Sequence, residues 1–108
     1  MIQLTVLYGH PQDTAAFDQY YQHKHAPLAR TIPGLRGYLV NKSAALDPRE
    51  KSLYYLIATL YFDDSAALQA GFSSPQGQAA AQDVQNFATG GVTLLTGEVQ
   101  VFDPVAIS

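Results

Sequence analysis

The chain has 108 residues, of which 47% are hydrophobic and 14% charged, and a net charge of −3. This composition is typical of one globular domain, predicted over residues 1–108, and excludes a disordered chain. The acidic balance lacks the positive field that nucleic acids and anionic membranes require. The chain has no cysteine, which rules out disulfides and thiolate sites. Its apolar runs are shorter than a signal or membrane span, so we expect a cytoplasmic protein.

Hydrophobic periodicity divides the chain into strands and helices in a simple order. Apolar residues alternate from Ile2 to Tyr8 as in a strand, and then recur at steps of three and four from Phe17 to Ile32 as on one helix face. The predicted elements are strands over 2–8, 35–42, 52–62 and 92–102, a helix ending before Pro33-Gly34, and a helix in two pieces, from Asp63 to about Phe72 and from Ser74 to Gly90.

The order β-α-β-β-α-β predicts an α+β, ferredoxin-like fold with a four-stranded antiparallel sheet. Helices on one face of such a sheet leave the other face wet and normally polar. Both alternating sets of residues in the strand 52–62 are instead largely apolar. Because the chain supplies only one helical layer, we expect a second copy to cover the other face, in a homodimer with its sheets packed together.

His25 is the most informative residue for function. On a helix it shares one face with Phe17, Tyr21 and Leu28, which places an imidazole on the side that packs against the sheet. It could be a core histidine held by a backbone hydrogen bond. Alternatively, the face borders a pocket, where a desolvated histidine titrates near neutrality and acts as an acid or a base.

Pro27 bears on this choice. It cannot donate to the carbonyl of His23, so we expect a kink or step that opens space beside His25 and the nearby tyrosines. Alternatively, Pro27 only begins a new short helix over 26–32.

Asp83 is the second candidate, because it lies beside the apolar stripe of the last helix. It could orient His25 and raise the imidazole pKa if the two helices are neighbours. Alternatively, it is a solvated residue that only flanks the stripe.

Other side chains suggest a ligand pocket less specifically. Arg36 and Tyr38 would share a face of the strand 35–42, where Arg36 could bind an anionic group, although exposed arginines are more often paired with acids. Tyrosines in the predicted strands offer apolar bulk with polar tips, as in aromatic-ligand pockets, but are also ordinary strand residues; they are Tyr8, Tyr38, Tyr54, Tyr55 and Tyr61.

Metal and nucleotide motifs are missing. His23 and His25 are two residues apart and point to opposite sides of a helix, so they cannot share an ion. The chain contains no GxGxxG, GxxxxGK[ST] or GxSxG motif. We therefore predict no metal and no cofactor.

The segment VLYGHPQDTAAFDQYYQHKHAPLARTIPGL resembles the opening of the EthD family, named for a gene cluster that degrades ethyl tert-butyl ether. The second half, SPQGQAAAQDVQNFATGGVTLLTGEV, is similar to the family's Ser-Pro-x-Gly and Asp-x-x-x-Phe pattern. The likeness runs from about residue 3 to about residue 102. It implies a dimeric α+β barrel, with a small-molecule site between helices and sheet in each subunit.

In the wider superfamily, relatives include cofactor-free monooxygenases, polyketide cyclases, haem-degrading enzymes and isomerising enzymes. The EthD branch is often labelled an oxidoreductase or reductase, but this sequence shows no redox group. Carried onto this chain, the resemblance makes His25 the pocket residue, with Asp83 and Tyr21 as its companions.

Together, these observations favour a cofactor-independent enzyme of a catabolic pathway, which acts on a small apolar molecule, aromatic or polyketide-like, by proton transfer in a pocket between helices and sheet. The alternatives are a non-catalytic dimeric binding protein accessory to a degradation pathway, and a purely structural role for His25. The expected catalytic residues are His25, Asp83 and Tyr21, and the expected substrate-binding residues are Tyr8, Tyr20, Arg36, Tyr38, Tyr54 and Phe87.

Overall fold

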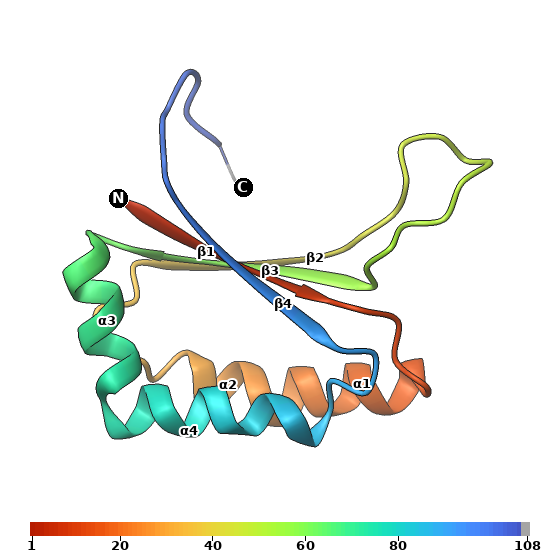
Figure 1. Cartoon of the computed structure of the whole chain (residues 1–108), viewed down its shortest axis with the longest axis horizontal. Coiled ribbons are helices and arrows are strands. Elements are labelled where there is room, and N and C mark those ends of the chain that lie inside the picture. Colours follow the sequence, from red (N-terminus) through yellow and green to blue (C-terminus); the bar gives the residue numbers. More distant parts are fainter. Residues whose placement is uncertain (107–108) are drawn as a thin grey trace.

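The computed structural model describes residues 1–106 as a four-stranded antiparallel sheet with helices on one face (Figure 1). The last two residues of the predicted domain, 107–108, lie outside the described part. The order β-α-β-β-α-β is confirmed. The elements are β1 (Ile2–Tyr8), α1 (Thr14–Tyr20), the π-helical turn η1 (Tyr21–His25), α2 (Ala26–Ala29), β2 (Gly37–Lys42), β3 (Leu56–Phe62), α3 (Ser65–Ser73), α4 (Pro75–Asp83), the 3₁₀ turn η2 (Val84–Asn86) and β4 (Val92–Glu98).

The two central strands are built by alternation. The sheet order is β2-β3-β1-β4, and every second residue of β1 and β3 is buried toward the helices. These inward residues form one core with Phe17, Tyr21 and Phe87 from the helical layer. The helices therefore close one face of the sheet, and a continuous core lies between the two layers.

Three strands are shorter than the sequence predicts, and for β3 and β4 the limit is their pairing with β1. β1 is seven residues long, and its end residue Tyr8 pairs with Leu56, while its first residue Ile2 pairs with Glu98. β3 therefore begins at Leu56 rather than 52, and β4 ends at Glu98 rather than 102. The third difference is at β2, which begins at Gly37 instead of residue 35.

The break between α3 and α4 explains the Ser-Pro-x-Gly motif. Ser74 is extended and its side chain accepts a hydrogen bond from Gly77 N–H at 3.0 Å, which caps α4, while Pro75 occupies the first turn. A Cβ at Gly77 would overlap the carbonyl oxygen of Gly71. The glycine therefore lets the two helices meet at close range and fixes the position of α4, which carries Asp83.

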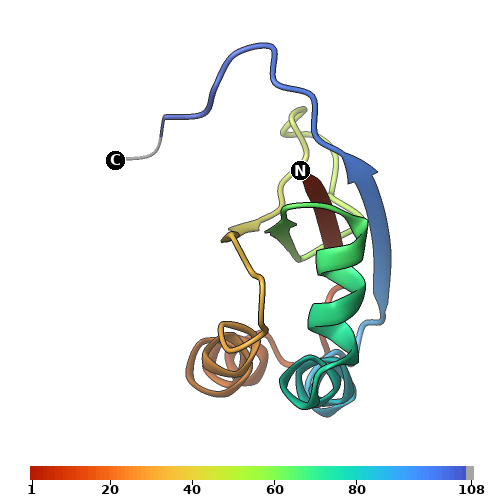
Figure 2. The same cartoon turned by 90° about the vertical axis from the view of Figure 1, so that its left-hand side faces the viewer.

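The opposite face of the sheet carries no helix (Figure 2). Ile57 and Tyr61 lie on it from β3, and the neighbouring Leu39 and Leu95 are 42% and 56% exposed. Within residues 1–106, no helix combines the length and the apolar character needed to cross a bilayer.

Candidate functional site

A cavity of about 400 Å³ lies between the sheet and the helices. Its walls come from all four strands on one side and from η1, α2, α3, α4 and η2 on the other. Most of the lining is apolar, as in ligand-binding pockets generally. Its polar members are His25, Tyr8, Tyr21, Tyr38 and Gln69.

A π-helical turn carries His25 into this cavity. The backbone N–H of Ala26 donates to Tyr21 O, five residues back, and Pro27 occupies the first turn of α2. Pro27 has no N–H for His23 O, so the backbone widens here instead of continuing the α-helical pattern. Both expectations for Pro27 thus describe parts of one arrangement, a step in the helix followed by a new short helix. The step leaves Tyr21 and His25 together on the buried face.

His25 is bonded on one side only. Its Nδ1 lies 3.0 Å from Asp83 Oδ2, which joins η1 to the end of α4. Its Nε2 has no hydrogen-bond partner among the described residues. Every fully buried side-chain nitrogen or oxygen in that part of the chain does have a partner, so Nε2 is not fully buried. Nε2 is therefore accessible from the cavity that His25 lines. This geometry differs from a structural core histidine, for which we would expect both ring nitrogens to be bonded.

Two further donors hold the Asp83 carboxylate. Tyr20 Oη donates to Asp83 Oδ1 at 2.6 Å, and Asn86 Nδ2 donates to the same oxygen at 3.0 Å. Oδ2 is thereby left for His25. Asn86 was missed by sequence reasoning, and the available signal was its spacing of three residues from Asp83, within reach across one helical turn.

Burial and hydrogen bonding set the protonation states of this pair. Burial lowers the pKa of His25 below its ordinary value of 6.5, and the hydrogen bond and charge of Asp83 oppose this only in part. The net direction is opposite to the raised imidazole pKa expected from the sequence. Burial raises the pKa of Asp83, but hydrogen bonds from Tyr20, Asn86 and His25 outweigh it and hold that pKa below its ordinary value.

At neutral pH the pair is therefore a neutral imidazole beside a carboxylate. A carboxylate only accepts hydrogen bonds, so the histidine proton lies on Nδ1 and Nε2 carries a lone pair. An imidazole in this state can take a proton from a molecule in the cavity.

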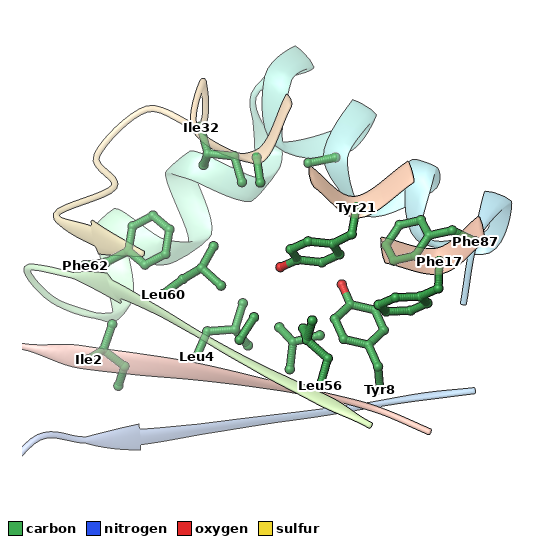
Figure 3. Close-up of a cluster of buried hydrophobic side chains, with 14 residues drawn as sticks. Ile2, Leu4, Tyr8, Phe17, Tyr21, Ile32, Leu56, Leu60, Phe62 and Phe87 are labelled. Carbon is green, nitrogen blue, oxygen red and sulfur yellow. The ribbon is translucent and has the colours of Figure 1, made fainter. Parts of the chain in front are cut away.

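Three tyrosines supply hydroxyl groups to the same region. Tyr21 Oη and Tyr38 Oη are 2.5 Å apart, and Tyr8 Oη has no hydrogen-bond partner among the described residues. Figure 3 shows the Tyr8 and Tyr21 hydroxyls pointing into the space between sheet and helices. Burial raises the pKa of each of these tyrosines, with Tyr8 and Tyr21 most affected. They are therefore protonated donors at neutral pH.

Tyr20 and Phe87 lie behind the cavity wall rather than in it. Tyr20 contacts Asp83, as described above, and Phe87 packs against His25 with ring centroids 4.6 Å apart. Both residues contact the His25–Asp83 pair, and neither lines the cavity.

Arg36 and Tyr54, two other expected binding residues, are not brought to the cavity. Arg36 precedes β2, is exposed, and donates to both carboxylate oxygens of Asp63. Alternation predicted that Arg36 would share a face with Tyr38, but this rule applies only within a strand. Tyr54 lies in the connection before β3, where its backbone N–H donates to Ser52 Oγ.

Within the described residues 1–106, no group of three His, Cys, Asp or Glu side chains is placed to hold a metal ion.

The chain matches the EthD domain model over residues 9–91. It is 47% identical over 95 residues to an uncharacterised 11.0 kDa protein of Rhodococcus erythropolis, encoded in the thcB-thcC intergenic region, covering 88% of this chain and 91% of that protein. The crystal structure of an EthD family protein from Bacillus halodurans is 39% identical, with a TM-score of 0.86, and the match covers 93% of this chain and 99% of that one.

More distant structures share the fold alone. A dimeric ferredoxin-like protein of unknown function from Thermobifida fusca matches with a TM-score of 0.68 at 15% identity, over 91% and 90% of the two chains. SnoaB, a cofactor-independent oxygenase from Streptomyces nogalater, matches with a TM-score of 0.59 at 14% identity, over 94% and 96%. The family match and the two closer relatives together show that the chain belongs to the EthD domain family.

Proposed function

We propose that this protein is a cofactor-independent enzyme that transfers a proton to or from a small apolar substrate, with His25 as the base. The observation that carries the proposal is the one-sided bonding of His25, whose Nδ1 is held by Asp83 while Nε2 is open to the cavity. A base within a largely apolar cavity is an arrangement found in enzymes more often than in inert cores.

The proposed step is removal of a proton next to a carbonyl group. The C–H bond breaks, the proton moves to His25 Nε2, and the electron pair forms an enolate whose charge rests on oxygen. Asp83 stabilises the resulting imidazolium through Nδ1–H. The imidazolium then returns a proton to the same carbon or to another atom of the substrate, so the step needs no redox partner.

Tyrosine hydroxyls would stabilise the enolate oxygen. Tyr8 has a free hydroxyl, and in the Tyr21–Tyr38 pair one of the two hydroxyl protons remains available after they bond to each other. Because these groups lie in an apolar site, their hydrogen bonds to a developing anion are stronger than they would be in water. In this proposal, Tyr21 and Tyr38 together supply one hydrogen bond to the enolate oxygen.

Exchange of carbon-bound hydrogen tests this proposal directly. The purified protein is expected to accelerate incorporation of deuterium from heavy water into β-tetralone, a neutral two-ring ketone, beyond the rate with an equal concentration of free imidazole. Proton NMR follows the loss of the signal next to the carbonyl. Binding of β-tetralone without faster exchange would instead indicate the non-catalytic binding protein.

We also propose that two copies pack their helix-free sheet faces together. Leu39 and Leu95 are exposed on that face, and the similar structure from Thermobifida fusca is described as dimeric. Sedimentation equilibrium is expected to give twice the 11.7 kDa chain mass. Leu95→Glu would place a charge in the buried interface and is expected to shift the equilibrium toward the monomer; a wild-type monomer at all concentrations would refute the packing.

A further inference from the structure

Within residues 1–106, no cationic side chain lines the cavity. The chain contains six lysine and arginine residues in all, and none of them borders the cavity. Three are engaged at the surface, where Arg36, Lys42 and Arg49 pair with nearby aspartates. An anionic ligand would therefore lose its hydration without gaining a counter-charge, which is strongly unfavourable.

The polar groups of the cavity gather at one end. His25 is in contact with Tyr21 and Tyr38 lies against Tyr21, while Tyr8 approaches Tyr21 edge to face at 5.7 Å between ring centroids. Figure 3 shows Leu4, Leu60 and Ile32 on the side away from Phe17 and Phe87. The exposed Gln69 is the other polar residue of the lining, and it comes from α3 rather than from this group. A matching ligand is therefore apolar with its hydrogen-bonding group at one end.

The donors and the acceptor at the polar end match a single hydroxyl group. Tyr8 can donate to a ligand oxygen, and His25 Nε2 can accept that oxygen's proton. A carboxylate has no proton to offer Nε2, and its charge would be added to the carboxylate of Asp83, which already lies 3.0 Å from the other ring nitrogen. An ether can accept from Tyr8 but cannot donate to Nε2.

From these three observations we infer that the cavity selects neutral hydroxyarenes and the enols they resemble, bound through one hydroxyl group between Tyr8 and His25, and rejects carboxylates of the same size. This inference rests on the proposed function for the state of His25, and it names the substrate class of that site. An enol is also the neutral form of the enolate that proton removal from a ketone produces.

A series of three two-ring compounds tests the inference. Isothermal titration calorimetry at neutral pH measures binding of β-naphthol, β-methoxynaphthalene and β-naphthoate to the purified full chain. We expect β-naphthol to bind about tenfold or more tightly than either of the others, since each lacks a hydrogen bond or carries an uncompensated charge. Equal or tighter binding of β-naphthoate, or no binding of β-naphthol, would overturn the inference.

A tyrosine variant locates the bound hydroxyl. Tyr8→Phe removes only an unpartnered hydroxyl from a buried ring, and is expected to weaken β-naphthol binding severalfold while leaving the unfolding temperature close to that of the wild type. Tyr61→Phe is the matched control, because Tyr61 lies on the opposite face of the sheet, outside the cavity. The Tyr61→Phe variant should bind β-naphthol as the wild type does. Unchanged binding by Tyr8→Phe would contradict the assigned position.

Failure of the inference and failure of the proposed function give different results. Selective binding of β-naphthol with no deuterium exchange into β-tetralone would leave the selectivity standing and remove the catalytic role. Exchange that persists while β-naphthoate binds as well as β-naphthol would leave the catalytic role standing and remove the selectivity.

Discussion

Replacing His25 with glutamine is expected to slow deuterium exchange into β-tetralone by about 10²–10⁴-fold, the usual contribution of a general base. Glutamine cannot take the proton, but its amide N–H can still donate to Asp83, so the buried carboxylate keeps a partner. The loss should therefore appear in the rate while circular dichroism shows a folded protein. In the wild type, the rate should fall on the acid side as His25 gains a proton, with an apparent pKa below 6.5.

His23→Gln is the matched control for this substitution. His23 lies on the same π-helical turn but is exposed, so its replacement makes the same chemical change outside the cavity. The control should retain the wild-type rate. A folded His25→Gln variant with the wild-type rate would show that His25 is not the base.

Replacing Asp83 with asparagine is expected to reduce the rate to a similar extent, by a different route. Tyr20 and Asn86 both donate to Oδ1, so the oxygen of the new amide takes that position. The amide NH₂ then faces His25 Nδ1 and donates to it, which moves the imidazole proton to Nε2. A histidine protonated on Nε2 cannot accept the substrate proton, and the corresponding change in a Ser-His-Asp triad lowers kcat about 10⁴-fold.

The pH dependence separates this effect from general damage. Asp83 normally raises the pKa of His25 against the effect of burial, so its removal should lower that pKa and move any remaining acid limb to lower pH. Asp47→Asn makes the same change in an exposed loop, where Asp47 pairs with Arg49, and should leave the rate and its pH profile unchanged. An Asp83→Asn variant with the wild-type rate would mean that the tautomer of His25 does not matter.

Periodicity was sufficient to predict the fold. The alternation in β1 and β3 and the helical stripe through His25 gave the correct order of elements, because burial on one face imposes these patterns directly. The contact between His25 and Asp83 was one of two alternatives that the sequence left open, because periodicity places both residues beside apolar helix stripes but does not show whether the two helices are neighbours. The structure places them 3.0 Å apart.

The missed parts depend on features that local patterns do not contain. The ends of β2 and β3 are set by which residues find a partner strand, and the errors at Arg36 and Tyr54 follow from predicting these strands too long. Asn86 was not assigned, because its spacing of three residues from Asp83 allows a contact but does not show that the two side chains point toward each other. The cytoplasmic location and the degradation pathway stay predictions.

The central claim is that His25 is neutral at neutral pH, with its proton on Nδ1 and a free lone pair on Nε2 facing the cavity. Nitrogen NMR of the wild type, with His25→Gln used to assign the signal, measures this directly. We expect an unprotonated Nε2 whose signal moves when β-naphthol is added, and a titration below pH 6.5. A proton on Nε2 at neutral pH, or a signal unaffected by the ligand, would contradict the account.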